Sequence, residues 1–370
     1  MNNDVCTEIL LHLPVESLLR FRAVCKFWCY VIDSPSFREL HINNNNNNNV
    51  SDDMARLELY FNNGQLRVLH NTKPLLTYKS DQLMGYEFSS YLDHQGLVRL
   101  YGPVMGLACI YDTQLRKPIA ICNPCLHQLK LLPPITTSSY SKPYRPCKIS
   151  QREVAIGFDE DYKVAQLLLC SGHFCLHGLM YSRKTDSWKD LAGVNGNLKI
   201  LSISPMKQVC ENGRFAHWYV VSATGYSRAE AYILSLDMKN EVFQTIRLFQ
   251  GHWNSTDIVV TYVAEDEHSF WRLDLPRDPS RNRVTIYRSS SGESRYRGRI
   301  ISWAPLMNVQ FPFSGELGLW RRTSCVLFKY WNYMFVFDYR ACKYSYWPCC
   351  NHFPVLFKHR CSFVSLENVS

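Results

Sequence analysis

The chain has 370 residues, enough for two domains or for one large domain with a small appendage. Hydrophobic residues make up 46% and charged residues 20%, which is typical of a soluble globular protein, and the 14% of aromatic residues favour strands. No stretch approaches the ~20 apolar residues that span a bilayer, and no basic region precedes the first apolar positions. We therefore expect no membrane partner, a cytoplasmic or nuclear location, and mostly free thiols among the 15 cysteines.

Residues 4–40 are predicted to be helical. One apolar stripe recurs at i, i+3, i+7, i+10 and i+14 and comprises Leu18, Phe21, Cys25, Trp28 and Ile32. Because proline suits the first turn of a helix, a first helix should end near Leu13 and a second should begin at Pro14. Ser34-Pro35 closes the segment. So short a segment carries more large apolar side chains than it can bury alone, and therefore needs a partner surface.

Seven consecutive asparagines at 43–49 begin a predicted flexible linker that runs to residue 53. From residue 54 to 370 short apolar runs are bounded by Gly, Pro, Asn, Asp and Ser, which predicts strands. The runs are GLACIY (106–111), KPIAIC (117–122), VAQLLLC (164–170), HWYVV (217–221), AYILSL (231–236), DIVVTYV (257–263) and NYMFVFD (332–338).

Four ten-residue units within this β region align with one another, at 123–132, 182–191, 237–246 and 338–347. Each has a polar turn and bulky residues at its seventh and tenth places, so each is predicted to be a hairpin. The starts lie 59, 55 and 101 residues apart, which suggests a degenerate copy near 290–299, and a weaker copy is expected near 62–71. A period of ~50 residues with several strands per unit is typical of a propeller-like array, here of about six repeats.

The N-terminal segment resembles the F-box of plant proteins. DVCTEILLHLPVESLLRFRAVCKFWCYVIDSPSF matches its D-V-x-x-E-I-L start, its L-P-V-x-S-L-L-R-F core, its V-C-K-x-W step and its S-P-x-F end, almost without a gap from Asp4 to Phe37. One departure stands at the start, where Met1-Asn2-Asn3 replaces the Leu-Pro pair that members usually carry before the first acidic residue.

The β region resembles the F-box-associated domain of plant F-box proteins, the group that includes the S-locus F-box proteins. The matching blocks occur in order as GPVMGL (102–107), NPCLHQLKLLPP, GFDEDYKV (157–164), YSRKTDSW (181–188), NGRFAHW (212–218) and ILSLD (233–237). Beyond Phe249 the resemblance thins. It implies a multidomain α + all-β chain: a small helical F-box at 1–42, an Asn-rich linker at 43–53, and a β-propeller-like F-box-associated domain at 54–370.

The resemblance also implies a function without catalysis, as the substrate-recognition subunit of an SCF-type (Skp–cullin–F-box) ubiquitin ligase. The F-box would bind a Skp-type adaptor on a cullin scaffold, and the β domain would hold a target protein for ubiquitination and proteasomal degradation. The predicted adaptor contacts are Leu13, Pro14, Leu18, Leu19, Phe21, Val24, Cys25 and Trp28. For each of them the alternative is packing between the helices.

The segment from Arg272 to Arg322 holds ten arginines and four acids, out of a formal net charge of +9 for the chain. Solvated loops explain such a segment, and a basic face for an acidic partner is the functional alternative. The predicted substrate-binding residues are Arg295, Arg297, Arg299, Arg321 and Arg322. A basic RNA-binding or scaffolding β protein with a vestigial F-box is the competing hypothesis, but nucleic acid is not the partner that we expect. A pollen S-locus determinant that recognises a stylar ribonuclease is subordinate, because an acidic target suits the charge better than a basic ribonuclease.

The sequence gives no reason to expect a catalytic site, a metal or a cofactor. Two Cys/His clusters, at 170–177 and 349–361, lack the spacing of common zinc sites. Acidic runs at 159–161 and 265–267 are best explained as solvated turns, since adjacent side chains point apart. No phosphate loop, G-x-S-x-G elbow or dinucleotide fingerprint is present.

Overall fold

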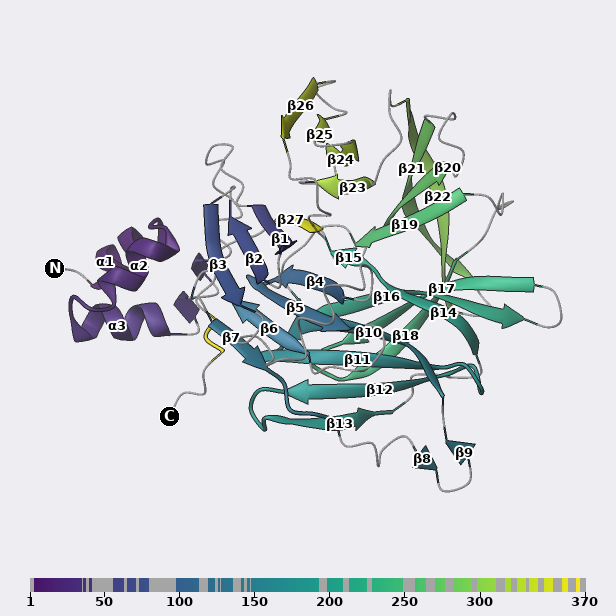
Figure 1. The fold of residues 1–370 in the computed structure, drawn as a ribbon, viewed down its shortest axis with the longest axis horizontal. Coiled ribbons are helices and arrows are strands. Elements are labelled where there is room, and N and C mark those ends of the chain that lie inside the picture. The colour runs from purple at the N-terminus through teal and green to yellow at the C-terminus, as the bar shows by residue number, and fades with distance from the viewer. Residues whose placement is uncertain are drawn as a thin grey trace.

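The computed structural model describes residues 3–34, 36–37, 40–41, 56–62, 65–70, 73–79, 98–112, 119–123, 126, 128–135, 141–142, 145–146, 148–192, 198–208, 213–224, 228–248, 257–263, 270–276, 283–294, 298–310, 317–320, 325–330, 333–338, 343–348, 355–358 and 364–366. Three N-terminal helices lie to one side of a body of strands (Figure 1). None of the described helices has the length and apolar character that a bilayer crossing requires. The predicted linker, and with it the domain boundaries at 42/43 and 53/54, lies outside the described residues and stays a prediction.

The helical segment consists of α1 (Asn3–Leu11), α2 (Val15–Phe21) and α3 (Lys26–Asp33). Pro14 is the N-cap of α2, with φ −66° and ψ 154°, so the second helix begins one residue later than predicted. The predicted continuous stripe from Leu18 to Ile32 is interrupted, because Cys25 is extended (φ −157°, ψ 160°) and its Sγ accepts the Trp28 N–H at 3.4 Å. The break between α2 and α3 lets both ends of the stripe lie in one small core.

Six four-stranded antiparallel groups are formed by the described strands, two of them within one nine-stranded sheet. We number these six groups in chain order and refer to each as a sheet. The first sheet is β27 (Val355–Lys358), β1 (Arg56–Asn62), β2 (Gln65–His70) and β3 (Lys73–Lys79), and the second is β4 (Val98–Val104), β5 (Leu107–Asp112), β6 (Ala120–Asn123) and β7 (Gln128–Leu131). The third sheet is β10 (Ile149–Phe158), β11 (Tyr162–Cys170), β12 (Cys175–Ser182) and β13 (Ser187–Leu191). The fourth, fifth and sixth are β14 (Lys199–Pro205), β16 (Phe215–Thr224), β17 (Arg228–Asp237), β18 (Val242–Leu248); β19 (Asp257–Val263), β20 (Phe270–Pro276), β21 (Arg283–Ser294), β22 (Gly298–Gln310); and β23 (Leu317–Trp320), β24 (Cys325–Tyr330), β25 (Tyr333–Asp338), β26 (Lys343–Pro348). Short β8 (Ser141–Lys142) pairs with β9 (Arg145–Pro146), and β15 (Lys207–Gln208) pairs with β19.

The two ends of the β region meet in the first sheet. There β27 from the C-terminal part pairs with β1, with Arg56 opposite Lys358, and Figure 1 shows the two strands side by side. Closing a series of sheets in this way protects edges that could otherwise pair with other chains. The C-terminal residues Val364 and Leu366 are also fastened, because the Asn123 Nδ2 donates to the Val364 carbonyl and the Leu366 N–H donates to Gln128 Oε1, both at 2.8 Å.

The four predicted hairpin units are confirmed, and they share one register. In each unit the first residue pairs with the sixth, as Asn123–Gln128, Ser182–Ser187, Asp237–Val242 and Asp338–Lys343. Every unit joins the third and fourth strands of its sheet. The degenerate copy near 290–299 contains the equivalent β21–β22 turn, where Ser294 pairs with Gly298 across a loop one residue shorter. The predicted copy at 62–71 covers the β1–β2 turn instead, one hairpin before the equivalent turn that follows His70.

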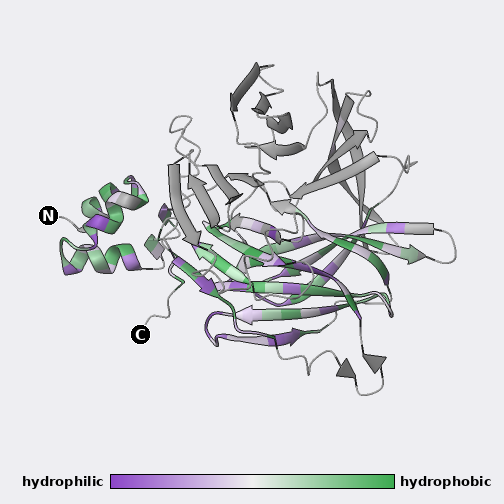
Figure 2. Cartoon of the chain, viewed as in Figure 1, coloured by the Kyte–Doolittle hydropathy of each residue, from purple (hydrophilic) through white to green (hydrophobic). Residues whose placement is uncertain are grey.

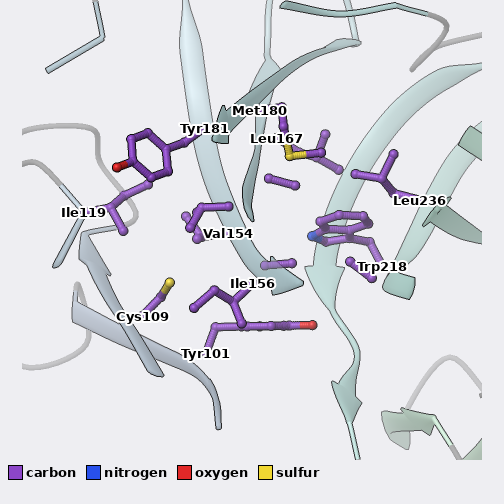
Figure 3. Packing of buried hydrophobic residues seen from close by; sticks show 14 of the residues in the cluster. Tyr101, Cys109, Ile119, Val154, Ile156, Leu167, Met180, Tyr181, Trp218 and Leu236 are labelled. Atoms are coloured by element: carbon purple, nitrogen blue, oxygen red, sulfur yellow. The ribbon is translucent and has the colours of Figure 1, made fainter. Parts of the chain in front are cut away.

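The main core fills the space between the second, third and fourth sheets (Figure 3). Trp218 and Tyr181 are completely buried there. Figure 2 shows β11 largely hydrophobic, whereas β13 at the outer edge is mostly hydrophilic. Two glycines permit a close approach in this core: the Phe158 N–H donates to the Gly213 carbonyl at 2.7 Å, and a Cβ on Gly157 would lie 2.7 Å from that same oxygen. The two glycines come from separate sequence blocks, GFDEDYKV and NGRFAHW.

Candidate functional site

The helical segment closes its own core but leaves large apolar side chains in solvent. Leu18 and Ile32 are fully buried, whereas a set that we name the apolar rim is half or more exposed. The apolar rim consists of Val5 (51%), Ile9 (50%), Val24 (61%), Tyr30 (78%) and Leu40 (51%). The number of exposed apolar residues on so small a unit makes it a candidate interaction surface.

Polar contacts join the end of α2 to the end of α3, and the end of α1 to His41. Arg22, just after α2, donates from Nη2 to Asp33 Oδ2 at the end of α3 at 2.9 Å. The His41 ring is buried, which lowers its pKa, and its Nε2–H donates to the Leu13 carbonyl at 2.8 Å. The neutral imidazole thereby supplies a partner to a carbonyl left open where α1 ends. These contacts give the apolar rim a defined scaffold.

The eight predicted adaptor contacts fall into three groups. Pro14, Val24 and Cys25 are exposed, and Leu18 lies in the core with no exposed surface. The other four are half-buried and pack against that core, namely Leu13, Leu19, Phe21 and Trp28. Their adaptor-binding role stays a prediction, but a partner can reach the exposed three without rearranging the helices. The sequence reasoning did not select Val5 and Ile9, although their i, i+4 spacing places them on one face of α1.

Most of the predicted arginine surface lies outside the described residues. This holds for Arg295, Arg297, Arg321 and Arg322. Arg299 lies on β22, where its backbone pairs with that of Glu293 on β21, and its side chain is outside the described set. Their role in binding a target remains a prediction.

Two Cys–His contacts occur in the first Cys/His cluster. Cys170 Sγ lies 3.4 Å from His173 Nδ1, and Cys175 Sγ lies 3.7 Å from His177 Nε2. In the part of the chain that the structure describes, no three His, Cys, Asp or Glu side chains are grouped so as to hold a metal ion. The second cluster, at 349–361, lies outside the described residues.

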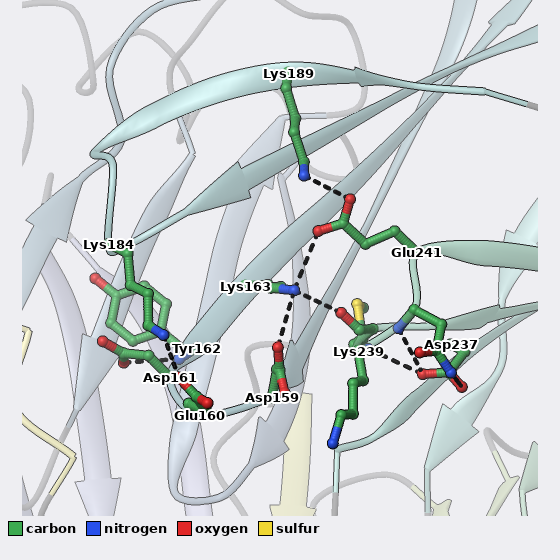
Figure 4. Close-up of polar contacts among 12 residues, drawn as sticks. Asp159, Glu160, Asp161, Tyr162, Lys163, Lys184, Lys189, Asp237, Lys239 and Glu241 are labelled. Atoms are coloured by element: carbon green, nitrogen blue, oxygen red, sulfur yellow. Dashed lines mark hydrogen bonds and ion pairs between the residues drawn. The ribbon is translucent and has the colours of Figure 1, made fainter.

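Each acid of the run at 159–161 pairs with a different basic side chain (Figure 4). Asp159 pairs with Lys163 at 3.3 Å, Asp161 pairs with Arg183 at 3.2 Å, and Glu160 pairs with Lys184. Each carboxylate thus has its own basic partner, and the arrangement is that of charged turns rather than of two acids sharing a reaction centre. The run at 265–267 lies outside the described residues.

Ion pairs also join successive sheets at equivalent positions of the hairpin units. The eighth residue of one unit, Lys130, contacts the fifth residue of the next, Asp186, at 2.8 Å. Lys189 contacts Glu241 at 2.6 Å in the same relation, one sheet further on. Hydrogen bonds from Lys130 and Tyr181 lower the pKa of Asp186. The repeat therefore encodes contacts between sheets as well as hairpins within them.

A buried carboxylate ties together the first strands of neighbouring sheets. Glu153 on β10 is fully buried and accepts hydrogen bonds from Arg99 Nη1 on β4 at 2.6 Å, Tyr111 OH at 2.8 Å and Gln151 Nε2 at 2.7 Å. The Gln151 amide also contacts the Ile203 carbonyl on β14. Burial raises the pKa of Glu153, and the Arg99 charge opposes that rise. With its oxygens occupied by structural donors, Glu153 connects three sheets.

Comparison with known proteins now places the chain in a family. The model of the F-box associated beta propeller domain matches residues 104–347, and the model of the F-box domain matches residues 1–40. A putative F-box protein of Arabidopsis thaliana is 32% identical over 44% of this chain and 43% of its own length. A second F-box protein of that plant is 24% identical over 68% of this chain and 57% of its own length. The chain thus spans about half the length of the curated relatives it matches.

Among solved structures, TolB from Acinetobacter baumannii aligns with a TM-score of 0.42 and 10% identity over 86% of this chain and 70% of TolB. The Dos1 propeller aligns with a TM-score of 0.38 and 9% identity over 77% of this chain and 64% of its own. The family assignment rests on the sequence models, which cover most of the chain and agree with the helices and repeated sheets. The chain belongs to the plant F-box proteins that carry an F-box associated beta propeller domain.

Proposed function

We propose that this chain is the non-catalytic substrate-recognition subunit of an SCF-type ubiquitin ligase. Its F-box binds a Skp-type adaptor on a cullin scaffold, and its β domain binds a target protein that is then ubiquitinated and degraded by the proteasome. The observation that carries this proposal is the apolar rim, which a closed helical core does not need for its own folding. Standard protein interfaces bury ~1,200–2,000 Å² in total, and their apolar centre excludes water.

The test uses the full chain and a pair of matched valines. Val24 on the helical segment is 61% exposed, and Val242 at the start of β18 is 55% exposed. Both are replaced by Asp, and capture of a purified Skp-type adaptor is measured by surface plasmon resonance. Val24→Asp should weaken adaptor binding by about tenfold or more, because the new carboxylate would lose its water in an apolar interface. Val242→Asp should bind as the wild type does.

Circular dichroism of both variants reports whether they remain folded. Loss of adaptor binding in a folded Val24→Asp protein, with Val242→Asp unchanged, supports the proposal. A wild-type chain that does not bind the adaptor contradicts it, and so does equal binding by all three proteins.

A further inference from the structure

An aromatic side chain stands exposed at the turn between β11 and β12. Phe174 is 44% exposed and has φ 53°, a left-handed conformation that non-glycine residues rarely adopt. Its carbonyl accepts the Ile200 N–H of β14 at 2.7 Å, which places the next residue, Leu201, beside the turn. Leu201 is 43% exposed. The turn is open, since a Cβ on Gly172 would meet nothing within 4 Å.

Two lysines belong to the segments that meet at this turn. Lys199 precedes Ile200 on β14, and the Lys148 carbonyl accepts the Ser171 N–H of the turn at 3.0 Å. Both lysines are exposed, and neither forms an ion pair with any described residue. The segments that meet here are 148–152, 170–178 and 198–205, and their sequences contain no Asp or Glu. We name this face, formed by Lys148, Phe174, Lys199 and Leu201, the Phe174 surface.

The Phe174 surface lies at the opposite end of its sheet from the charged hairpin turns. Successive turns of an antiparallel meander alternate between the two ends, so the β11–β12 turn and the β12–β13 turn that carries Asp186 are separated by the length of β12 (Cys175–Ser182). In Figure 1 β12 points toward the helical segment, so its Phe174 end faces away from the helices. A ligand at this end leaves the apolar rim accessible.

The left-handed conformation of Phe174 belongs to its turn. A bulky residue in the left-handed region costs of order 1 kcal/mol, and glycine avoids that cost. The ring recovers little of it by burial, since nearly half of its surface is in solvent. The same conformation occurs at the equivalent position of the β12–β13 and β17–β18 turns, at Asp186 (φ 47°) and Glu241 (φ 58°), so the exposed ring, and not its backbone, points to a ligand.

We propose that the Phe174 surface is the docking site for an acidic peptide segment of the target, one that inserts an apolar side chain between Phe174 and Leu201 while its carboxylates pair with Lys148 and Lys199. This inference rests on the proposed function and deepens it, because it states which face holds the target and what chemistry that face selects. Aromatic anchors surrounded by complementary charge are the usual centres of such interfaces.

The test is a selection of short random peptides by the full chain bound to its adaptor. Phe174→Gly is the informative variant, because glycine accepts φ 53° and keeps the backbone bond to Ile200, so lost binding does not reflect a lost fold. Val242→Ala serves as the control, since it removes an exposed apolar side chain elsewhere in the β domain.

We expect selected peptides to combine Asp or Glu with one aromatic or aliphatic residue. Phe174→Gly should weaken the tightest of them by about tenfold or more, and Val242→Ala should leave its affinity unchanged. The double variant Lys148→Glu, Lys199→Glu should not bind these peptides. Binding by the wild type should weaken as salt is added.

The proposal is overturned if the peptides carry no acidic residues, if Phe174→Gly binds them as the wild type does, or if single-stranded RNA rather than peptide occupies the surface. Adaptor binding is recorded for every sample. A chain that binds the adaptor but no acidic peptide refutes this inference alone, whereas a chain that fails to bind the adaptor refutes the proposed function.

Discussion

Glu241 is the position where a single substitution should reveal how strongly neighbouring sheets are coupled. Its carboxylate lies in the β17–β18 turn of the fourth sheet and contacts two lysines of the third sheet, Lys163 at 3.1 Å and Lys189 at 2.6 Å. The side chains of Glu241 and Lys163 are only 23% and 13% exposed, whereas Lys189 is 56% exposed. Glu241→Gln removes the charge and keeps the shape of the side chain.

The magnitude follows from these exposures. A hydrogen bond between charged groups contributes ~1.5–3 kcal/mol when it is shielded from water, so the Lys163 contact accounts for most of the effect. An exposed ion pair contributes ~0–1 kcal/mol, and the Lys189 contact adds at most that. We expect Glu241→Gln to lower the free energy of unfolding by about 2 kcal/mol at neutral pH, which corresponds to a fall in Tm of about 4 °C.

The pH dependence has a definite sign. Burial by itself would raise the pKa of Glu241, but the hydrogen bonds from Lys189 and Lys163 outweigh it and hold the pKa below its ordinary value of 4.5. A carboxylate with a depressed pKa stabilises the fold above pH 4.5, and this contribution is lost as the pH falls through the folded-state pKa. The difference between wild type and Glu241→Gln should therefore shrink in acid.

Differential scanning fluorimetry of the full chain over a pH series measures both effects. Glu160→Gln is the matched control, because Glu160 and its partner Lys184 are 76% and 60% exposed and their pairing should leave Tm unchanged. Equal shifts for the two variants would show that contacts between sheets contribute nothing beyond surface charge, and a difference that persists in acid would contradict the ionic explanation.

Three further substitutions test other contacts. Trp188→Phe removes the 2.9 Å hydrogen bond from Nε1 to the Pro133 carbonyl and should cost about 1 kcal/mol in chemical denaturation. Gly157→Ala places a Cβ 2.7 Å from the Gly213 carbonyl and should cost about 1–3 kcal/mol through overpacking, with a matching fall in Tm. Burial raises the pKa of Glu153, so this group makes stability fall as the pH rises from about 4.5 through the folded-state pKa. Glu153→Gln should flatten that slope in thermal unfolding across the same range, although it also weakens the contact with Arg99.

Local patterns in the sequence predicted much of this fold, because the repeated hairpins are themselves local. The polar turn and the two bulky residues of each unit lie within ten positions, and those positions determine a turn and the pairing across it. Closure by β27 could not be foreseen, since it pairs Arg56 with Lys358 and no local pattern reports so distant a contact. The break at Cys25 was missed for another reason: the apolar spacing continues across it and does not reveal that Cys25 is the extended N-cap of α3.

The candidate surfaces were harder to predict than the fold. Composition and spacing pointed to Leu18 as readily as to Val24, and only the packing of three helices separates a core residue from an exposed one. Phe174 gave no signal, because an aromatic residue beside Cys and His suggests a strand interior or a metal site. Its exposure and its positive φ are properties of the folded turn. The sequence did show that the segments around Phe174 contain no Asp or Glu.

The placement of charge in the third and fourth sheets bears directly on the kind of target. A set of carboxylates there is already engaged with Lys or Arg side chains of the same chain: Asp159, Glu160, Asp161, Asp186, Glu230, Asp237 and Glu241. Most of the acids that an approaching protein meets there are therefore compensated, but exposed Asp190 on β13 forms no ion pair with a described residue, and neither do Lys148 and Lys199. If the target docks at the Phe174 surface as proposed, these charges would favour an acidic target over a basic one. A basic ribonuclease would be disfavoured at the proposed docking site for the same reason, whatever the arginine-rich segment contributes.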